Sequence, residues 1–222
     1  MEARITQLNK DEILRYLGYH GQPLEQFEEE QLTRGIKKVI STAQPRLVYR
    51  RFAVQDGQLP DFPLPGNDIA ALLRTSREAV IFAATLGAEV ERLLMRSGTV
   101  NMADALVMDA CASAAIENVC DNFESDLAAE LRKDGAELWL TDRFSPGYGD
   151  MPLSFQDPLC AMLDTTRRIG LTVTKNHLMV PRKSVTAVIG IAEMPQPKRA
   201  ACETCTMRES CSFRKEGRGC GK

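Results

Sequence analysis

A loop rich in glycine and proline carries the first residues that could bind a ligand. It begins at Arg143 and reads Arg-Phe-Ser-Pro-Gly-Tyr-Gly-Asp-Met-Pro. Gly147 and Gly149 permit a close backbone approach that other residues resist, and a proline restrains the backbone after Ser145. The planar guanidinium of Arg143 and the aromatic ring of Tyr148 suit a ligand that has a carboxylate and a flat ring. The alternative interpretation is a surface turn whose arginine is only solvated.

A carboxylate inside a long helical pattern is the second candidate. Residues 101–133 contain neither glycine nor proline and predict one helix. Glu117 shares a narrow stripe of that helix with small, mostly apolar residues: Leu106, Ala110, Ser113 and Cys120. A carboxylate buried there must be paired, hydrogen-bonded or in contact with a ligand, because a bare buried charge is costly. A structural arginine partner, or exposure of this face to solvent, would also account for Glu117.

Cysteines near the C-terminus form a third candidate site. Four of the seven cysteines lie there with the spacing Cys-x2-Cys-x5-Cys-x8-Cys, at Cys202, Cys205, Cys211 and Cys220. In a reducing compartment such a cluster indicates metal binding before disulfide formation. A four-iron cluster is favoured because structural zinc usually takes two Cys-x2-Cys pairs, and zinc is the alternative. The other three cysteines are expected to be buried small hydrophobic residues: Cys111, Cys120 and Cys160.

Secondary-structure elements must position these residues, and periodicity with turn residues predicts them along the whole chain. Helices are predicted at 9–18 (with Asn9 as N-cap and Gly18 as stop), 22–43, from 68 onward, 88–96, 101–133 and 158–168. Strands are predicted at 46–54, 79–84, 137–141, 175–180 and 184–191, the last two as a hairpin through 181–183. This irregular order of helices and strands predicts an α+β fold with a largely antiparallel twisted sheet flanked by helices.

Composition and charge narrow the class of protein. The 222 residues are 44% hydrophobic and carry a net charge of −2, but residues 198–222 hold seven Lys or Arg against three Glu. A basic tail on an acidic body is too small a basic surface for nucleic-acid binding. The sequence lacks a long apolar run and a signal-peptide pattern, so we expect a cytoplasmic protein that does not bind membranes. The two histidines, His20 and His177, are expected to be structural.

The Arg-x-x-x-Gly-Tyr motif of the loop resembles the signature with which the activation domain of cobalamin-dependent methionine synthase holds S-adenosylmethionine. Pro152 matches a proline of that family, and residues 170–185 are similar as well. The resemblance covers about residues 100–192 and, more loosely, the N-terminal half. The chain departs from the family at Met151, where a cysteine is usual. It also turns into the cysteine-rich segment where the synthase continues with further tyrosines at its ligand site.

The resemblance implies a function and a domain organisation. Residues 1–195 would form an activation-like domain that binds S-adenosylmethionine, and residues 196–222 would form a metal-binding tail. The domain would reactivate a cobalamin-dependent methionine synthase, or a related corrinoid protein, whose cofactor has been oxidised to cob(II)alamin. Flavodoxin or ferredoxin would supply an electron, and S-adenosylmethionine would supply the methyl group. An iron–sulfur cluster in the tail could relay that electron.

The same resemblance implies roles for individual residues. Arg143 would bind the carboxylate of S-adenosylmethionine, and Glu117, which matches a glutamate in the family's long helix, would bind its amino or hydroxyl groups. The Ser145 backbone and Tyr148 would contact the adenosyl part, with Gly147 allowing a close approach of the backbone. None of these residues would act as an acid or a base, because the task is to position two reactants.

Two other functions remain open at the level of the sequence. One is a corrinoid-protein adaptor or docking module whose tail holds a structural zinc ion. The other is a self-contained methyltransferase that acts on a small molecule. The lack of a recognisable pair of residues that would activate a nucleophile disfavours the second.

Overall fold

A four-stranded antiparallel sheet with the order β1-β2-β6-β3 forms the centre of the protein. The computed structural model describes residues 1–19, 21–133, 137–195 and 209. The sheet is built from β1 (Arg46–Ala53), β2 (Ser76–Thr85), β3 (Trp139–Leu140) and β6 (Ser184–Ala192). A separate two-stranded ladder pairs β4 (Thr172–Val173) with β5 (Met179–Val180). The predicted α+β class with a mainly antiparallel sheet is therefore confirmed.

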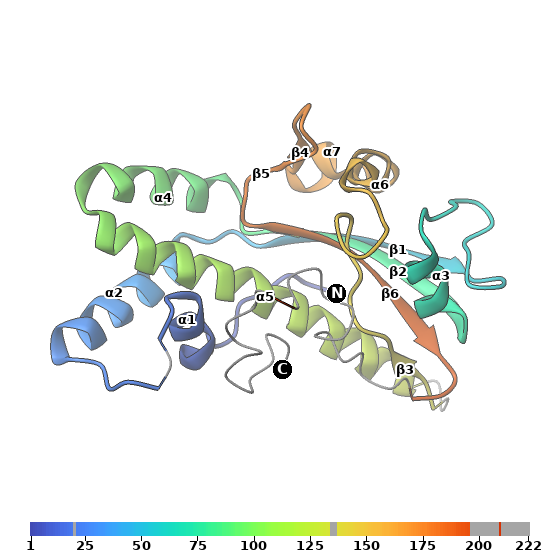
Figure 1. Ribbon diagram of the computed structural model, residues 1–222, viewed down its shortest axis with the longest axis horizontal. Coiled ribbons are helices and arrows are strands. Elements are labelled where there is room, and N and C mark those ends of the chain that lie inside the picture. The colour runs from blue at the N-terminus through green and yellow to red at the C-terminus, as the bar shows by residue number, and fades with distance from the viewer. Residues whose placement is uncertain (20, 134–136, 196–208, 210–222) are drawn as a thin grey trace.

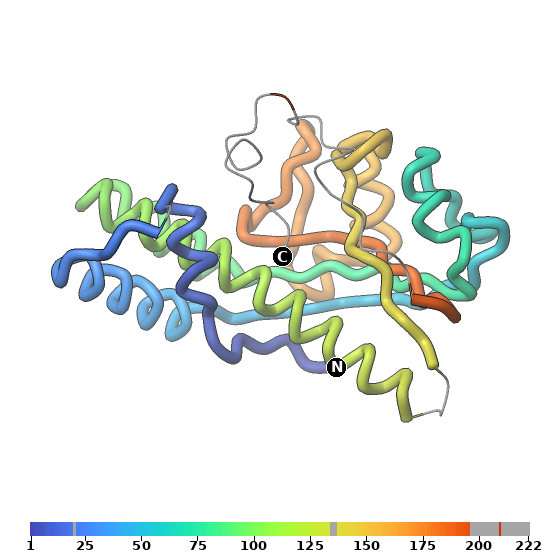
Figure 2. The backbone as a smooth tube through the Cα atoms, turned by 60° about the horizontal axis from the view of Figure 1, so that its bottom comes forward, coloured from blue at the N-terminus to red at the C-terminus, as the bar shows by residue number. Residues whose placement is uncertain are grey.

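Helices cover both faces of the sheet. They are α1 (Lys10–Tyr16), α2 (Gln26–Thr42), α3 (Asn67–Leu73), α4 (Ala88–Val100), α5 (Met102–Lys133), the short 3-10 helix η1 (Leu153–Phe155), α6 (Gln156–Leu163) and α7 (Thr165–Ile169). Helix α5 runs along one face of the sheet, and α1, α2 and α4 pack around it (Figure 1). Helices α3, α6 and α7 lie on the opposite side, as the turned view in Figure 2 shows. No helix among the described residues is long and apolar enough to cross a membrane.

Two hydrophobic cores follow from the period of two in the central strands. Val80 and Phe82 of β2 point into the core shared with α5, whereas Ala79 and Ile81 point into the core shared with α3, α6 and α7. All four side chains are fully buried. Strands β2 and β6 therefore read as nearly continuous apolar runs, because each is covered on both faces.

Local signals placed most of the elements correctly. Asn9 caps α1 with its side-chain oxygen, which accepts from the backbone N–H of Asp11 and Glu12 at 2.9 and 3.3 Å. Gly18 follows the helix at φ +81°, as a glycine stop requires. The predicted long helix corresponds to α5, and the cysteines at 111, 120 and 160 are buried as expected.

The predicted hairpin between residues 175–180 and 184–191 is wrong. Strand β6 pairs antiparallel with β2 and β3, and β5 pairs with β4 instead. The reason is burial: seven consecutive residues at the end of β6 are buried, and β2 is a neighbour long and apolar enough to pair along their length. Residues 175–180 are mostly exposed and supply only two residues to a ladder, so they cannot fill that position.

Two further predicted elements are shorter in the structure. The helix predicted at 158–168 is divided into α6 and α7 by Asp164, whose backbone is left-handed at φ +53°. The strand predicted at 137–141 is reduced to Trp139–Leu140, which pairs with the end of β6. Its position on the sheet edge still delivers the chain to Arg143.

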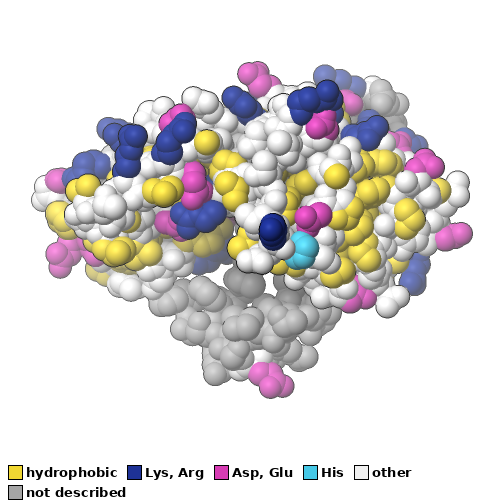
Figure 3. Space-filling view, turned by 90° about the horizontal axis from the view of Figure 1, so that it is seen from above, with side chains coloured by type: hydrophobic (Ala, Val, Ile, Leu, Met, Phe, Trp, Pro, Cys, Tyr) yellow, Lys and Arg dark blue, Asp and Glu magenta, His cyan; other side chains and the backbone are white. Residues whose placement is uncertain are grey.

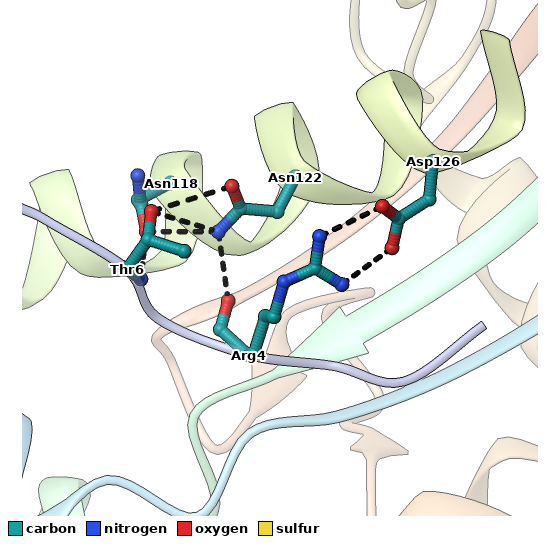
Figure 4. Close-up of polar contacts among 5 residues, drawn as sticks. All are labelled: Arg4, Thr6, Asn118, Asn122 and Asp126. Atoms are coloured by element: carbon teal, nitrogen blue, oxygen red, sulfur yellow. Dashed lines mark hydrogen bonds and ion pairs between the residues drawn. The ribbon is translucent and has the colours of Figure 1, made fainter. Parts of the chain in front are cut away.

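The N-terminal segment lies along α5 (Figure 4). The guanidinium of Arg4 binds the Asp126 carboxylate, with Nη2 at 2.7 Å from Oδ1. Thr6 donates its backbone N–H to Asn118 at 2.9 Å, and Asn122 donates to the Arg4 carbonyl at 3.0 Å. These α5 residues are spaced four apart, so they form one stripe of the helix. The neighbouring stripe of α5 is left for the loop that follows β3.

Candidate functional site

Arg143 lies against three carboxylates of α5. Its Nη2 is 3.1 Å from Oε2 of Glu117 and 3.0 Å from Oδ1 of Asp121, and its Nε is 2.9 Å from Oε1 of Glu124. The spacing i, i+4, i+7 places the three carboxylates on one face of the helix. We call Arg143, Glu117, Asp121 and Glu124 the Arg143 cluster.

The backbone on either side of Arg143 is held by β6. Thr141 donates its N–H to the Gly190 carbonyl at 3.0 Å, and its Oγ1 accepts from the Gly190 N–H at 2.8 Å. Phe144 exchanges two backbone hydrogen bonds with Val188, at 3.0 and 2.8 Å. Arg143 therefore projects from a segment that is fixed to the sheet, and its side chain is only 24% exposed.

Burial and crowding of like charges set the protonation of the cluster. Burial raises the pKa of Glu124 from 4.5 to about 7, and the Asp121 and Glu117 charges add to this against the opposing effect of Arg143. Burial also acts to lower the pKa of Arg143, but the surrounding carboxylates outweigh it and the pKa is raised. One guanidinium faces three carboxylates, so the cluster has an excess of negative charge when Glu124 is ionised.

Two polar atoms inside the cluster lack hydrogen bonds within the described part of the chain. Nη1 of Arg143 is buried without an acceptor. Oε1 of Glu124 is also buried, and its 2.9 Å contact with Arg143 is an ion pair without the alignment of a hydrogen bond. A buried donor left unused costs free energy. A ligand oxygen that reached Nη1 would therefore supply a contact that the protein itself does not make.

The structure brings together two of the five residues predicted for the ligand site. Glu117 and Arg143 are ion-paired, so the arginine partner considered for Glu117 is Arg143 itself. Arg143 is not a solvated turn residue. Ser145 is partly buried, whereas Gly147 and Tyr148 lie at the exposed tip of the loop, with Tyr148 61% exposed. No hydrogen bond or ion pair between described residues joins Tyr148 to Arg143 or Glu117.

The two loop glycines have different surroundings. Both have positive φ, +91° for Gly147 and +51° for Gly149. A Cβ on Gly147 would meet only Leu153, at the ordinary contact distance of 3.4 Å, whereas a Cβ on Gly149 would overlap the Asp68 carboxylate. Gly149 thus allows the Asp68 carboxylate to pack against the loop backbone, whereas the space beside Gly147 is open except for Leu153.

Several residues near the cluster are not among those predicted from the sequence. A cavity of about 450 Å³ adjoins it between α5 and β3, lined by Asp121, Glu124, Ser125, Ala128, Arg132, Leu138, Trp139 and Leu140. Tyr16 of α1 lies close to Glu117, and burial together with the charges of Glu12 and Glu117 raises its pKa to about 12. The helical spacing of Asp121 and Glu124 from Glu117 was visible in the sequence, but nothing in it indicated Tyr16 or Trp139.

His177 has a carboxylate partner that its position in the sequence did not suggest. Its Nδ1 lies 2.5 Å from Oδ2 of Asp157, which ties the turn between β4 and β5 to the start of α6. A histidine and an acidic side chain lie at the edge of a hydrophobic area on the face seen in Figure 3. The contact is compatible with the structural role expected of His177. His20 lies outside the described residues.

The predicted metal ligands Cys202, Cys205, Cys211 and Cys220 also lie outside the described residues. Within the described ranges, no group of three or more His, Cys, Asp or Glu side chains is arranged to hold a metal ion. The tail therefore remains a prediction from the sequence.

The fold defines an α+β domain in which a long helix crosses an antiparallel sheet beside an arginine loop. Among solved structures, the crystal structure of the MetH reactivation domain bound to AdoHcy is similar to this chain, with a TM-score of 0.60. The two share 12% sequence identity over 93% of this chain and 80% of that chain, so the relation is one of fold. Neither a protein-family model nor a curated protein sequence matches the chain.

Proposed function

We propose that this protein binds S-adenosylmethionine and presents its methyl group to the cobalamin of a partner, which reactivates a cobalamin-dependent methionine synthase or a related corrinoid protein. The observation that carries the proposal is the Arg143–Glu117 pair at the start of the Arg-x-x-x-Gly-Tyr loop. Its support from the fold is the similarity to a reactivation domain that was crystallised with AdoHcy.

The Arg143 cluster fits the polar end of S-adenosylmethionine. The ligand carboxylate would bind Arg143, gaining the unused Nη1 donor and displacing one of the three carboxylates of α5. The displaced carboxylate would then face the ligand ammonium, a role that suits Glu117. The Ser145 backbone and Tyr148 remain the candidates for the adenosyl part, with Gly147 leaving room beside them.

In the proposed reaction, one electron from flavodoxin or ferredoxin reduces the cobalt of the partner's cob(II)alamin. The reduced cobalt's electron pair forms the bond to the methyl carbon, while the carbon–sulfur bond of S-adenosylmethionine breaks and leaves S-adenosylhomocysteine. This chain would hold and orient the methyl donor and would neither give nor take a proton.

Binding of S-adenosylmethionine tests the proposal directly. We expect one site per chain in calorimetric titration, and a Kd about fivefold to tenfold lower for S-adenosylmethionine than for S-adenosylhomocysteine. The reason is the excess negative charge of the cluster, because the sulfonium adds a positive charge that the thioether lacks, worth about 1 kcal/mol. Equal affinities would contradict the electrostatic argument, and absence of binding to either compound would overturn the proposed function.

Reactivation itself can then be measured with a corrinoid partner. Cob(II)alamin-loaded methionine synthase, a reductant and S-adenosylmethionine are mixed with and without this protein, and methylcobalamin is followed by its visible spectrum. Faster formation of methylcobalamin in the presence of the protein is the expected result. Binding of S-adenosylmethionine without any acceleration would favour a self-contained methyltransferase.

The tail over residues 196–222 is proposed to hold a metal through its four cysteines, as a four-iron cluster that relays the electron or as a structural zinc ion. We expect anaerobically purified protein to contain iron and sulfide, and to absorb visible light in a way that dithionite bleaches. Cys205→Ser should abolish the cluster, because a site with four ligands rarely survives the loss of one. Cys160→Ser, which alters a buried cysteine of α6, is the matched control.

The metal content separates the relay from the adaptor. Zinc at one per chain without sulfide would rule out the electron relay and favour an adaptor whose tail serves only for docking. A tail with no metal in the wild-type protein would contradict both versions.

A further inference from the structure

The loop that begins at Arg143 is fastened at its far end to helix α3. Asp150 accepts two backbone N–H bonds from the start of that helix, from Asn67 at 2.6 Å and from Asp68 at 3.1 Å. The helix has no capping side chain of its own, because its N-cap residue is Gly66. Asp150 therefore acts as the cap of α3 from a distant part of the chain.

Two glycines make this contact reciprocal. A Cβ on Gly66 would overlap the Asp150 carboxylate, and a Cβ on Gly149 would overlap the Asp68 carboxylate. Both glycines also have positive φ, +112° for Gly66 and +51° for Gly149. We call these four residues the clasp, since each carboxylate occupies the space left by the glycine of the other segment.

The ligand loop is thus held at both ends. Phe144 binds β6 through two backbone hydrogen bonds, and the clasp holds the residues after Tyr148. Met151, directly after the clasp residues, is 2% exposed and anchors the loop in the core shared with α3. Between these anchors, the N–H of Gly147 bonds to the Met151 carbonyl at 3.0 Å and closes a compact turn.

We propose that Asp150 is a positioning residue, which keeps the loop from Ser145 to Tyr148 in the conformation that binds S-adenosylmethionine by clasping it to α3. This inference rests on the proposed function. The backbone N–H groups at the helix start also hold the pKa of Asp150 below its ordinary value, so the carboxylate stays charged in the clasp at neutral pH. Asp150 itself needs no contact with the ligand.

The test measures two properties of Asp150 variants: their affinity for S-adenosylmethionine and the amide hydrogen exchange of the loop. We expect Asp150→Ala to raise the Kd for S-adenosylmethionine about tenfold in calorimetric titration, because only part of the population then has a competent loop. Amide hydrogen exchange of Gly147, Tyr148 and Met151 should accelerate without ligand, while amides of β2 keep their protection. Asp150→Asn retains one acceptor oxygen and should restore part of the affinity.

One further variant is a control, and another tests the contact between Gly66 and Asp150. Asp61→Ala removes an exposed carboxylate from the segment before α3 and should leave both the affinity and the exchange of the loop unchanged. Gly66→Ala should weaken binding by pushing Asp150 away and by straining the backbone at φ +112°. In the Asp150→Ala background the carboxylate part of this effect should be lost, and only the strain should remain.

The outcomes distinguish this inference from the proposed function. If the wild-type protein binds S-adenosylmethionine and Asp150→Ala binds it equally well, the positioning role is overturned and the proposed function stands. Weaker binding with unchanged amide exchange in the loop also overturns positioning. If the wild-type protein does not bind S-adenosylmethionine, the proposed function fails, and a positioning role for this ligand fails with it.

Discussion

Arg143→Ala is expected to weaken S-adenosylmethionine binding by about tenfold to a hundredfold, since a bidentate charge-assisted contact contributes about 1.5–3 kcal/mol. The same change should destabilise the fold, which the motif alone would not suggest. It leaves Glu117, Asp121 and Glu124 facing one another without their shared cation. Discounting for the 24% exposure of the side chain, we expect a loss of about 2 kcal/mol and a fall in Tm of about 5 °C.

Two matched variants make the Arg143 result interpretable. Arg4→Ala removes an arginine that pairs with Asp126 on the same helix, but this pair is exposed to solvent and should contribute little to stability. Glu117→Gln keeps the shape of one partner of Arg143 and should weaken ligand binding while relieving part of the crowding of charge. Titration calorimetry and thermal unfolding of all three variants separate the effect of Arg143 on ligand binding from its effect on stability. An Arg143→Ala protein with wild-type affinity would remove Arg143 from the ligand site.

The stability of the protein is expected to decrease as the pH rises from about 4.5 to about 7, through the titration of Glu124. The pKa of Glu124 in the folded state is raised from 4.5 to about 7, chiefly by burial. In this range the folded protein binds more protons than the unfolded chain does, so the free energy of unfolding falls with rising pH. Glu124 contributes about 1–3 kcal/mol to the free energy of unfolding by this linkage. This contribution is fully present below about pH 4.5 and is lost once the pH exceeds about 7.

Glu124→Gln tests this assignment because it imitates the protonated side chain at every pH. The variant should have a flatter profile of unfolding free energy between pH 4.5 and 7, and it should exceed the wild type in stability at pH 8. Glu130→Gln, on an exposed part of the same helix, is the control and should retain the wild-type slope. Urea unfolding at a series of pH values supplies the measurement. A wild-type slope in Glu124→Gln would show that another group is responsible.

Local patterns in the sequence were sufficient for most of the fold. Three local features are found as predicted: the apolar runs of β2 and β6, the glycine-free length of α5 and the Asn9 cap. Each is determined by residues that are close together in the sequence. These features depend on the periodicity of burial and on backbone propensity, which a few consecutive residues express. Six residues of the loop, the Arg-x-x-x-Gly-Tyr motif, were enough to single out Arg143, and the role of this motif in ligand binding stays a prediction.

Only the tertiary structure decided how these local pieces meet. Arg143 and Glu117 were both predicted, but their direct contact and the participation of Asp121 and Glu124 required α5 and the loop to be placed together. The clasp of Asp150 joins segments more than 80 residues apart. The pairing of β6 with β2 instead of β5 depends on which strand, however distant in the sequence, is long and apolar enough to pair along β6. Periodicity reveals that a face must be buried, whereas the partner that buries it is set by the joint packing of the whole chain.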